Sequence, residues 1–223
     1  MPDQHPSAVL FDIDGTLVDS NYLHIDAWTR AFDDVGHPVP AWRIHRCIGM
    51  DSAKLLEALL GDELDRLGDD AKERHSAHYE RDAERLRPFD RAQDLLRAVA
   101  DRGLKVVLAT SAPPHEFELL QQVLAVDDAV AEYTTAGDVE TAKPAPDVVQ
   151  VALEKAGVDA DAAVMVGDTV WDVEAAGRAG VRAIGVLSGG IGEGELRDAG
   201  AIAVYEDVAA LLRELDGSPL VSS

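Results

Sequence analysis

The sequence is poor in cysteine and in long apolar runs. Its one cysteine, Cys47, cannot form an internal disulfide, which favours a reducing, cytoplasmic environment. No stretch approaches the ~18 apolar residues of a membrane-spanning helix. The first residues have neither the basic nor the apolar region of a secretory signal. We therefore expect a cytoplasmic protein that does not enter the membrane.

Positive charge is also scarce. The 223 residues include 42 acidic against 20 basic side chains, a formal net charge of −22, and only five of the basic residues are lysines. Such a surface repels nucleic-acid backbones and anionic membranes, so we expect neither as a partner. An anionic substrate would need a local positive site built against this field. Oligomeric state is not readable from the sequence.

The apolar pattern changes twice along the chain. Strands are predicted at 8–11, 104–109, 130–134, 162–166 and 182–187. Helices are predicted at 21–36, 40–48, 51–60, 63–86, 90–102, 114–125, 146–156, 170–179 and 207–215. Strands that alternate with helices predict an α/β fold with a doubly wound, Rossmann-like parallel sheet.

No strand is predicted between the first strand and Pro88. We therefore expect residues 1–19 and 89–223 to form an α/β core, and residues 20–88 to form a helical insert. The insert would be a small second domain, placed directly after the first strand. The polar tail 217–223 is expected to be disordered.

The first strand ends in two carboxylates. Asp12 and Asp14 follow the apolar run 8–11 and precede Gly15. Two acids at i and i+2 repel each other unless a cation lies between them. Mg²⁺ is a hard ion that prefers oxygen ligands, and it would suit this position. Asp and Gly are also common turn residues, so this segment alone leaves a simple turn open.

Polar residues follow the second predicted strand and precede a later helix. In an open parallel sheet, ligands bind beyond the carboxyl ends of the strands. Thr110 and Ser111 come at such an end, where a hydroxyl and free amides can hold phosphate, or where either side chain can cap the next helix. Lys143 lies in a proline-flanked loop, and it can balance a phosphate and a carboxylate or extend into solvent.

A third group follows the strand at 162–166. Asp168 would reach the same sheet edge as Asp12 and complete a carboxylate cage for Mg²⁺. Asp172 can belong to the metal shell, or it can form a capping box with Thr169, and the two roles are compatible. The ordered recurrence of these pieces at strand ends favours a functional site over isolated turns and caps.

The chain resembles the haloacid dehalogenase superfamily of phosphohydrolases over essentially its whole length. The resemblance rests on four motifs, carried by Asp12-Ile-Asp14-Gly15-Thr16, Thr110, Lys143-Pro144, and Gly167-Asp168 through Asp172. The helical insert is similar to the first cap type of the superfamily. By pattern, the chain looks most like phosphoglycolate-phosphatase-like and β-phosphoglucomutase-like members.

The resemblance implies a division of labour between the two acids. Asp12 would attack phosphorus and form an aspartyl-phosphate. Asp14 would protonate the leaving alcohol and then activate water. Lys143 would balance the charge of the nucleophile and the phosphate. The insert would act as a lid that excludes bulk water.

The same resemblance implies a metal and a phosphate site. Mg²⁺ would be held by Asp12, the Asp14 carbonyl oxygen and Asp168, with Asp172 in its shell. The phosphate oxygens would be bound by Gly15, Thr110, Ser111 and Lys143.

Two departures from the mutases favour a phosphatase acting on a small phosphate ester. The mutases have a basic residue after a cap glycine, whereas this chain has Asp51 and Ser52 after Gly49 and Met50. The mutases also have a basic residue after the second motif, where this chain has Ala112. A β-phosphoglucomutase-like activity is the alternative. Dehalogenases and phosphonate-cleaving members lack an acid equivalent to Asp14.

A non-catalytic receiver-like phospho-acceptor is disfavoured, because such a domain is shorter and has neither the insert nor a second acid like Asp14. His24 resembles a mutase histidine near the acid/base aspartate, so it is expected to contact Asp14 or substrate, or else to be a partly buried helix residue. Substrate choice is expected to depend on the insert near residues 24, 45–54 and 74–79, where the candidates by position are His45, Arg46, Met50, Asp51 and Lys54. A solvated helix end would explain most of these equally well.

Overall fold

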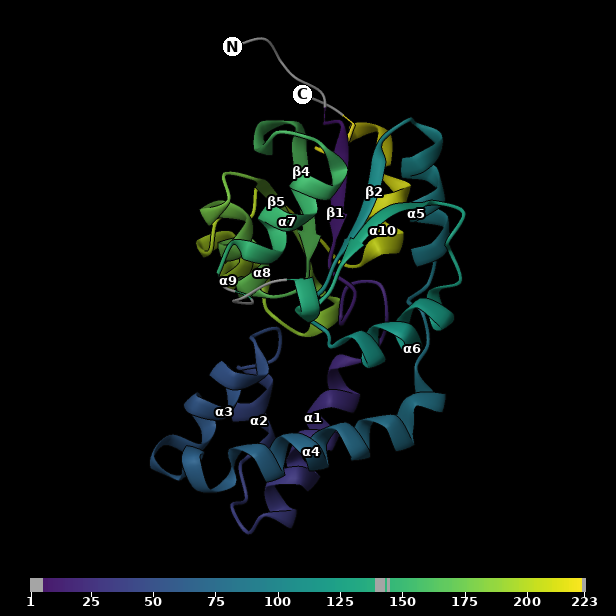
Figure 1. Cartoon of the computed structure of the whole chain (residues 1–223). Helices are drawn as coiled ribbons and strands as arrows, with labels where there is room; N and C mark the ends of the chain where they lie inside the picture. The colour runs from purple at the N-terminus through teal and green to yellow at the C-terminus, as the bar shows by residue number, and fades with distance from the viewer. Residues whose placement is uncertain (1–5, 139–142, 144, 222–223) are drawn as a thin grey trace.

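The computed structural model describes residues 6–138, 143 and 145–221. Its core is a six-stranded sheet in the order β3-β2-β1-β4-β5-β6, with every neighbouring pair parallel (Figure 1). The strands are β1 (Ala8–Phe11), β2 (Lys105–Ala109), β3 (Val130–Thr134), β4 (Ala163–Gly167), β5 (Arg182–Val186) and β6 (Ala203–Tyr205). The predicted α/β fold with a parallel sheet is confirmed.

Helices cover both faces of the sheet. Along β1, Val9 and Phe11 belong to one apolar cluster, and Ala8 and Leu10 belong to the other. Side chains of a strand alternate between the two faces, so a strand covered on both sides reads as an unbroken apolar run. The core helices are α5 (Ala92–Asp101), α6 (Pro114–Leu124), α7 (Asp147–Ala156), α8 (Val170–Arg178), α9 (Glu193–Asp198) and α10 (Val208–Arg213).

The segment after β1 is helical. It consists of α1 (Asn21–Asp34), α2 (Ala41–His45), α3 (Ser52–Leu60) and α4 (Leu64–Asp82). These helices lie beyond the carboxyl ends of the strands, at the end of the molecule away from both termini (Figure 1). They share an apolar cluster that includes Trp28, Phe32, Ile44 and Leu59. Short 3₁₀ turns occupy Gly61–Glu63, Ala83–Arg85, Ala136–Asp138, Ala160–Ala162, Leu187–Gly189 and Leu215–Gly217.

The chain crosses between core and insert twice, and the two crossings lie side by side. The Asp19 amide donates to the Arg87 carbonyl oxygen at 2.9 Å, and the Phe89 amide donates to the Leu17 carbonyl oxygen at 2.9 Å. Val18 and Pro88 form an isolated antiparallel bridge between them. The insert is therefore attached to the core by a short paired segment close to Asp12 and Asp14.

Two segments differ from the sequence expectations. Helix α9 and strand β6 were not predicted, because the glycine-rich stretch before them hides the apolar pattern and β6 has only three residues. The tail prediction is wrong as far as Val221: Leu220 is 0% exposed and joins the same apolar cluster as Leu215. One well-placed leucine is enough to hold this polar segment against the core. Residues 222 and 223 lie outside the described residues.

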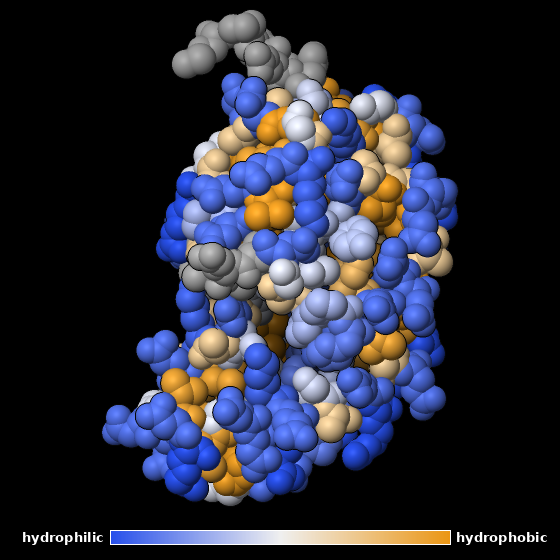
Figure 2. All heavy atoms as spheres, in the orientation of Figure 1, coloured by the Kyte–Doolittle hydropathy of each residue, from blue (hydrophilic) through white to orange (hydrophobic). Residues whose placement is uncertain are grey.

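None of the helices in the described ranges combines the length and apolar character needed to cross a bilayer. Polar side chains cover most of the face seen in Figure 2, with small apolar areas between them.

Candidate active site

A cavity of about 450 Å³ lies between the carboxyl edge of the sheet and the helical insert. The core contributes Asp12, Asp14, Thr110, Ser111 and Lys143 to its lining. Figure 2 shows the surface hollowed between these two parts of the molecule, with apolar atoms at the bottom of the hollow. The cavity thus brings together residues from the first three of the four motifs, which the sequence spreads over more than 130 positions.

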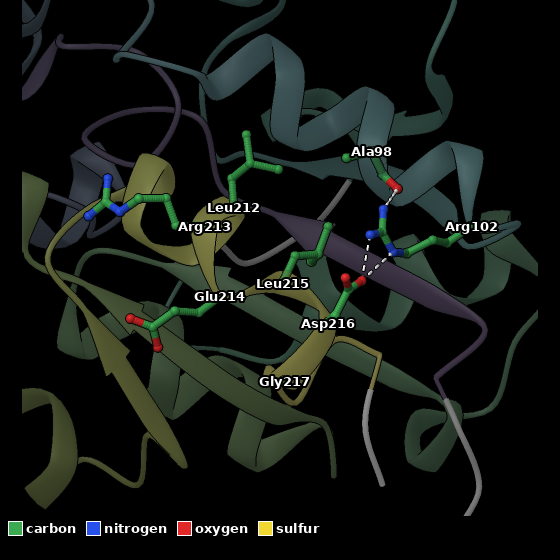
Figure 3. Close-up of a pocket in the computed structure, with 8 residues that line it drawn as sticks. All are labelled: Ala98, Arg102, Leu212, Arg213, Glu214, Leu215, Asp216 and Gly217. Atoms are coloured by element: carbon green, nitrogen blue, oxygen red, sulfur yellow. Dashed lines mark hydrogen bonds and ion pairs between the residues drawn. The ribbon is translucent and has the colours of Figure 1, made fainter.

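A second cavity, of about 380 Å³, lies where the strands begin, at the opposite end of the core. There Arg102 and Asp216 point toward one another, and Arg102 Nη1 donates to the Ala98 carbonyl oxygen at 2.8 Å (Figure 3). Of the described residues around this cavity, none is a predicted site residue. The first cavity, by contrast, is lined by the predicted site residues Asp12, Asp14, His24, Thr110, Ser111 and Lys143.

Three buried carboxylates lie together at the sheet edge. Asp12, Asp168 and Asp172 each offer an oxygen within 4.8 Å of the others. They meet because β1 and β4 are adjacent, with Phe11 opposite Val166 and the Asp12 amide donating to the Val166 carbonyl oxygen at 2.9 Å. The expected proximity of Asp12 and Asp168 therefore follows directly from strand order.

Lys143 lies among these carboxylates and is itself buried. Its Nζ contacts Asp12 Oδ1 and lies 2.7 Å from Asp172 Oδ1. Burial alone would lower the pKa of Lys143, but the two carboxylates raise it above its ordinary value, so the ammonium stays charged. The expected solvated alternative for this lysine is wrong. The loop residues 139–142 and Pro144 lie outside the described residues.

One ammonium cannot balance three carboxylates. Burial raises the pKa of Asp12 well above its ordinary value, opposed by Lys143 and reinforced by Asp172 and Asp168. Burial likewise raises the pKa of Asp168 to about 8, with the charge of Asp172 adding to the shift. A hard divalent cation would offset this excess of buried negative charge, and the oxygen-only donor set suits it. The site therefore fits a bound metal ion.

Asp168 and Asp172 are each fixed by further hydrogen bonds. Asp168 accepts from Thr16 Oγ1 at 2.9 Å and from Asn21 Nδ2 at 2.8 Å. Asp172 and Thr169 form a capping box at the start of α8, with Asp172 Oδ2 accepting from the Thr169 amide at 3.0 Å. The capping role of Asp172 is thus confirmed. Its other oxygen, Oδ1, faces Lys143, so the cap leaves that oxygen on the side of Asp12 and Asp168.

The Asp14 side chain has different neighbours from the triad. Its Oδ1 accepts from Ser20 Oγ at 2.6 Å and lies 3.4 Å from His24 Nε2. Burial alone would raise the pKa of Asp14. A hydrogen bond from His24, the charge of His24 and a hydrogen bond from Ser20 together lower that pKa below its ordinary value. Burial would lower the pKa of His24, and Asp14 raises it. The pair therefore stabilises a proton on its histidine side, next to the cavity.

His24 is held by stacked rings. Its ring stacks on Tyr79 with centroids 3.9 Å apart, and its Nδ1 lies 3.1 Å from His75 Nε2. His75 in turn stacks on Trp28, with centroids 4.1 Å apart. His24 thus fits both expectations for it, since it is a largely buried helix residue that also contacts Asp14.

The loop after β2 presents two hydroxyls to the cavity. Thr110 Oγ1 accepts from the Ala112 amide at 3.0 Å, which shapes the loop but does not cap α6. Within the described part of the chain, the buried Ser111 Oγ has no hydrogen-bond partner. A buried hydroxyl without a partner is costly, so Ser111 is available for a ligand. The alternative that these side chains merely cap the helix is not supported.

The predicted phosphate contact of Gly15 is not supported either. The Gly15 amide already donates to the Val18 carbonyl oxygen at 2.9 Å, and Gly15 is absent from the residues that line the cavity. Its φ is +74°, and an added Cβ would lie 2.5 Å from Asp168 Oδ2 and overlap the Asn21 side chain. Glycine is needed here for backbone conformation and close packing.

The insert candidates divide into two groups. His45 Nε2 lies 2.9 Å from the Gly189 carbonyl oxygen and Arg46 contacts Glu195, so these residues hold the insert to the core. Met50 and Asp51 line the cavity, whereas Lys54 is absent from its lining. The Asp51 carboxylate also caps α3 by accepting from the Ala53 amide at 2.7 Å.

Other lining residues were missed by the sequence reasoning. They are Asn21 and Trp28 of α1, Leu55 of α3, Lys72 of α4, Pro113, Pro114 and Glu116 at the start of α6, and Ala136 with Gly137. The lining residues Ile48, Gly49, Ser52, His75 and Ser76 fall within the ranges 45–54 and 74–79, which were expected to govern substrate choice. Lys72 and Ser76 are four positions apart on one helix face, a signal the sequence carries. That signal does not reveal that the face points to a cavity.

Comparison with known proteins identifies the family. A family model described as haloacid dehalogenase-like hydrolase matches residues 6–180. The chain belongs to the haloacid dehalogenase-like hydrolases. The predicted resemblance is therefore confirmed, and with it the expectation of an enzyme.

Three relatives span most of this hydrolase. A phosphoglycolate phosphatase of Rhodospirillum rubrum is 34% identical over 218 residues, which cover 92% of this chain and 89% of the relative. A phosphorylated carbohydrates phosphatase of Thermotoga maritima is 29% identical, with 93% and 99% covered. The crystal structure of a hydrolase from Pseudomonas syringae superposes with a TM-score of 0.90 at 36% identity, with 95% and 98% covered.

Proposed function

We propose that this hydrolase is a Mg²⁺-dependent phosphatase that cleaves a small phosphate monoester through an aspartyl-phosphate on Asp12. One observation carries the proposal. Asp12 lies in a buried triad of carboxylates, while the nearby Asp14 faces the same cavity with hydrogen-bonding partners of its own. Separate surroundings allow the two acids to do different work. Names of relatives that act on phosphoglycolate and phosphorylated carbohydrates support this substrate class.

The reaction has two displacement steps. In the first, an Asp12 carboxylate oxygen attacks phosphorus, and the bond from phosphorus to the leaving alcohol breaks. The leaving oxygen takes a proton from the Asp14–His24 pair, whose nearest atoms are 3.4 Å apart. In the second, Asp14 takes a proton from water, and the water oxygen attacks the aspartyl-phosphate. Inorganic phosphate leaves, and the Asp12 carboxylate is restored.

The remaining residues bind and orient. Asp12, the Asp14 carbonyl oxygen and Asp168 would hold Mg²⁺, with Asp172 completing the shell. When bound, the ion offsets the repulsion between the phosphate and the Asp12 carboxylate. Thr16 and Asn21 fix Asp168 through their hydrogen bonds.

Substrate phosphate is assigned to the loop after β2 and to the buried ammonium. Thr110, Ser111 and Lys143 would bind its oxygens, and Ser111 Oγ is the hydroxyl that lacks a partner within the described residues. We further assign residues 20–88 to a cap domain over a core formed by 1–19 and 89–223. The cap would exclude bulk water and contact the leaving group.

The mutase alternative is less well supported by the cavity. Of the lysine and arginine side chains that the structure describes, only Lys72 and Lys143 line it. Lys143 is engaged by Asp12 and Asp172, which leaves Lys72 alone to receive a second phosphate. Conversion of a hexose 1-phosphate with trace bisphosphate tests this directly. Isomerised sugar that forms faster than free phosphate would reverse the ranking.

Hydrolysis of p-nitrophenyl phosphate tests the main proposal. We expect Mg²⁺-dependent release of nitrophenol that stops in excess chelator and in Asp12→Asn. Full activity under either condition would refute the aspartyl-phosphate route through a metal-loaded triad. Asp198→Asn, an exposed change on α9, is the matched control and is expected to leave turnover unchanged.

A further inference from the structure

One buried acid beside the cavity has no part in the reaction described above. Glu116 lies in the first turn of α6, directly after the loop that carries Thr110 and Ser111. Its side chain lines the cavity between core and insert, and the residue is only 4% exposed. Glutamate is seldom buried to this degree without a partner. Its presence calls for a physical reason.

The Glu116 carboxyl has no hydrogen-bond donor among residues 6–138, 143 and 145–221. His115 Nε2 lies 3.8 Å from Oε1, which is longer than a hydrogen bond. Burial raises the pKa of Glu116, and the charge of His24 opposes that shift. A buried carboxyl without a donor costs free energy unless a ligand or water supplies one. The donor therefore has to come from the cavity side.

The surroundings of Glu116 disfavour a second anion. Asp14 and Asp51 line the same cavity. Of the cations that the described part of the insert contributes there, His24 is paired with Asp14 and Lys72 is an exposed residue. Ser52 and Ser76 add hydroxyls from the insert. A carboxylate on the leaving group would meet like charge here, and hydroxyl groups would find acceptors. A volume of about 450 Å³ lies in the range of small-molecule sites.

We propose that Glu116 accepts hydrogen bonds from hydroxyl groups of a neutral polyol or sugar leaving group, and so selects such phosphate esters over esters whose leaving group carries a carboxylate. This inference rests on the proposed phosphatase function. It adds a specificity-determining residue on the core side of the cavity. The leaving group of phosphoglycolate carries a carboxylate. The proposal therefore gives this chain a different substrate preference from the relative named phosphoglycolate phosphatase.

The test compares two substrates that differ at one carbon. Glycerol 3-phosphate has a hydroxymethyl group where 3-phosphoglycerate has a carboxylate. For the wild-type chain with Mg²⁺, we expect kcat/KM to favour glycerol 3-phosphate by at least about tenfold, the range for one buried hydrogen bond to a charged group. Glu116→Gln keeps the side-chain shape and removes the charge, and it is expected to reduce the ratio to within about threefold. Glu118→Gln, exposed on the same helix, should keep the wild-type ratio.

The outcomes separate this inference from the proposed function. A wild-type ratio near one, or one that favours 3-phosphoglycerate, would overturn the inference while p-nitrophenyl phosphate hydrolysis still supports a phosphatase. A Glu116→Gln variant with a lower Tm and an unchanged ratio would assign Glu116 a structural role and overturn it as well. If kcat/KM for phosphoethanolamine exceeded that for glycerol 3-phosphate more than tenfold, Glu116 would select a cationic leaving group, and the proposal of a neutral polyol would be overturned. No hydrolysis of any ester would refute the proposed function itself.

Discussion

Magnesium binding by this hydrolase is expected to depend steeply on pH. In the metal-free protein, burial raises the pKa of Asp168 to about 8, so its carboxyl is largely protonated at neutral pH. Mg²⁺ binds the ionised form and has to displace that proton. From pH 8 to pH 6 the ionised fraction of such a group falls about fifty-fold, and the apparent affinity should fall by the same factor. The raised pKa of Asp12 adds to the trend.

Isothermal titration calorimetry of the purified chain measures this linkage without any substrate. Titrations at pH 7 in buffers of different ionisation enthalpy should report release of about one proton per Mg²⁺ bound. Asp168→Asn removes the titrating group, so binding should weaken and its pH dependence should flatten. Asp198→Asn on the surface should behave like wild type. Equal affinity at pH 6 and pH 8 with no proton release would refute the charge argument for the triad.

Other predictions concern the two acids and one glycine. In calorimetry, Asp14→Asn should still bind Mg²⁺ through the backbone carbonyl of residue 14. Its kcat should fall by roughly 10²–10⁴, the usual contribution of a positioned proton donor. Wild-type turnover would exclude Asp14 from proton transfer. Asp12→Asn should form no phosphoenzyme in a rapid-quench experiment, and a labelled Asp12→Asn protein would contradict its role. Gly15→Ala combines strain at φ +74° with overlap onto the Asn21 side chain. In urea denaturation, its free energy of unfolding should fall by at least about 2 kcal/mol. Gly36→Ala has φ +72° and open space, so it should lose only about 1 kcal/mol; equal losses would refute the packing argument.

Much of the fold could be predicted from local patterns. The strand at 8–11 reads as an apolar run because helices cover both faces of the sheet, and the capping box of Asp172 follows from its spacing to Thr169. The tail around Leu220 could not be predicted in this way. Its burial depends on a distant apolar cluster, which composition does not encode.

In the candidate site too, residues placed by local patterns could be predicted, and residues placed by long-range packing could not. Asp12 and Asp168 follow strands, and the edge that strand ends share is fixed by the parallel topology. Glu116 and Lys72 lie on helices of different parts of the chain. Whether they face a common cavity depends on how the insert packs against the core, and no local pattern reports that. Gly15 shows the converse, since a motif residue can be required for backbone shape rather than for contact with substrate.

The paired crossings at Leu17–Phe89 and Asp19–Arg87 have a mechanical consequence. Any rotation of the insert pivots on two hydrogen-bonded chain segments, which resist twisting more than a single linker does. Such a rotation carries His24 with it, because His24 belongs to α1, whereas Asp12 stays anchored to the sheet. Under the proposed mechanism, Asp12 would keep its place at the sheet edge, and a rotation of the insert would change the distance between His24 and Asp14.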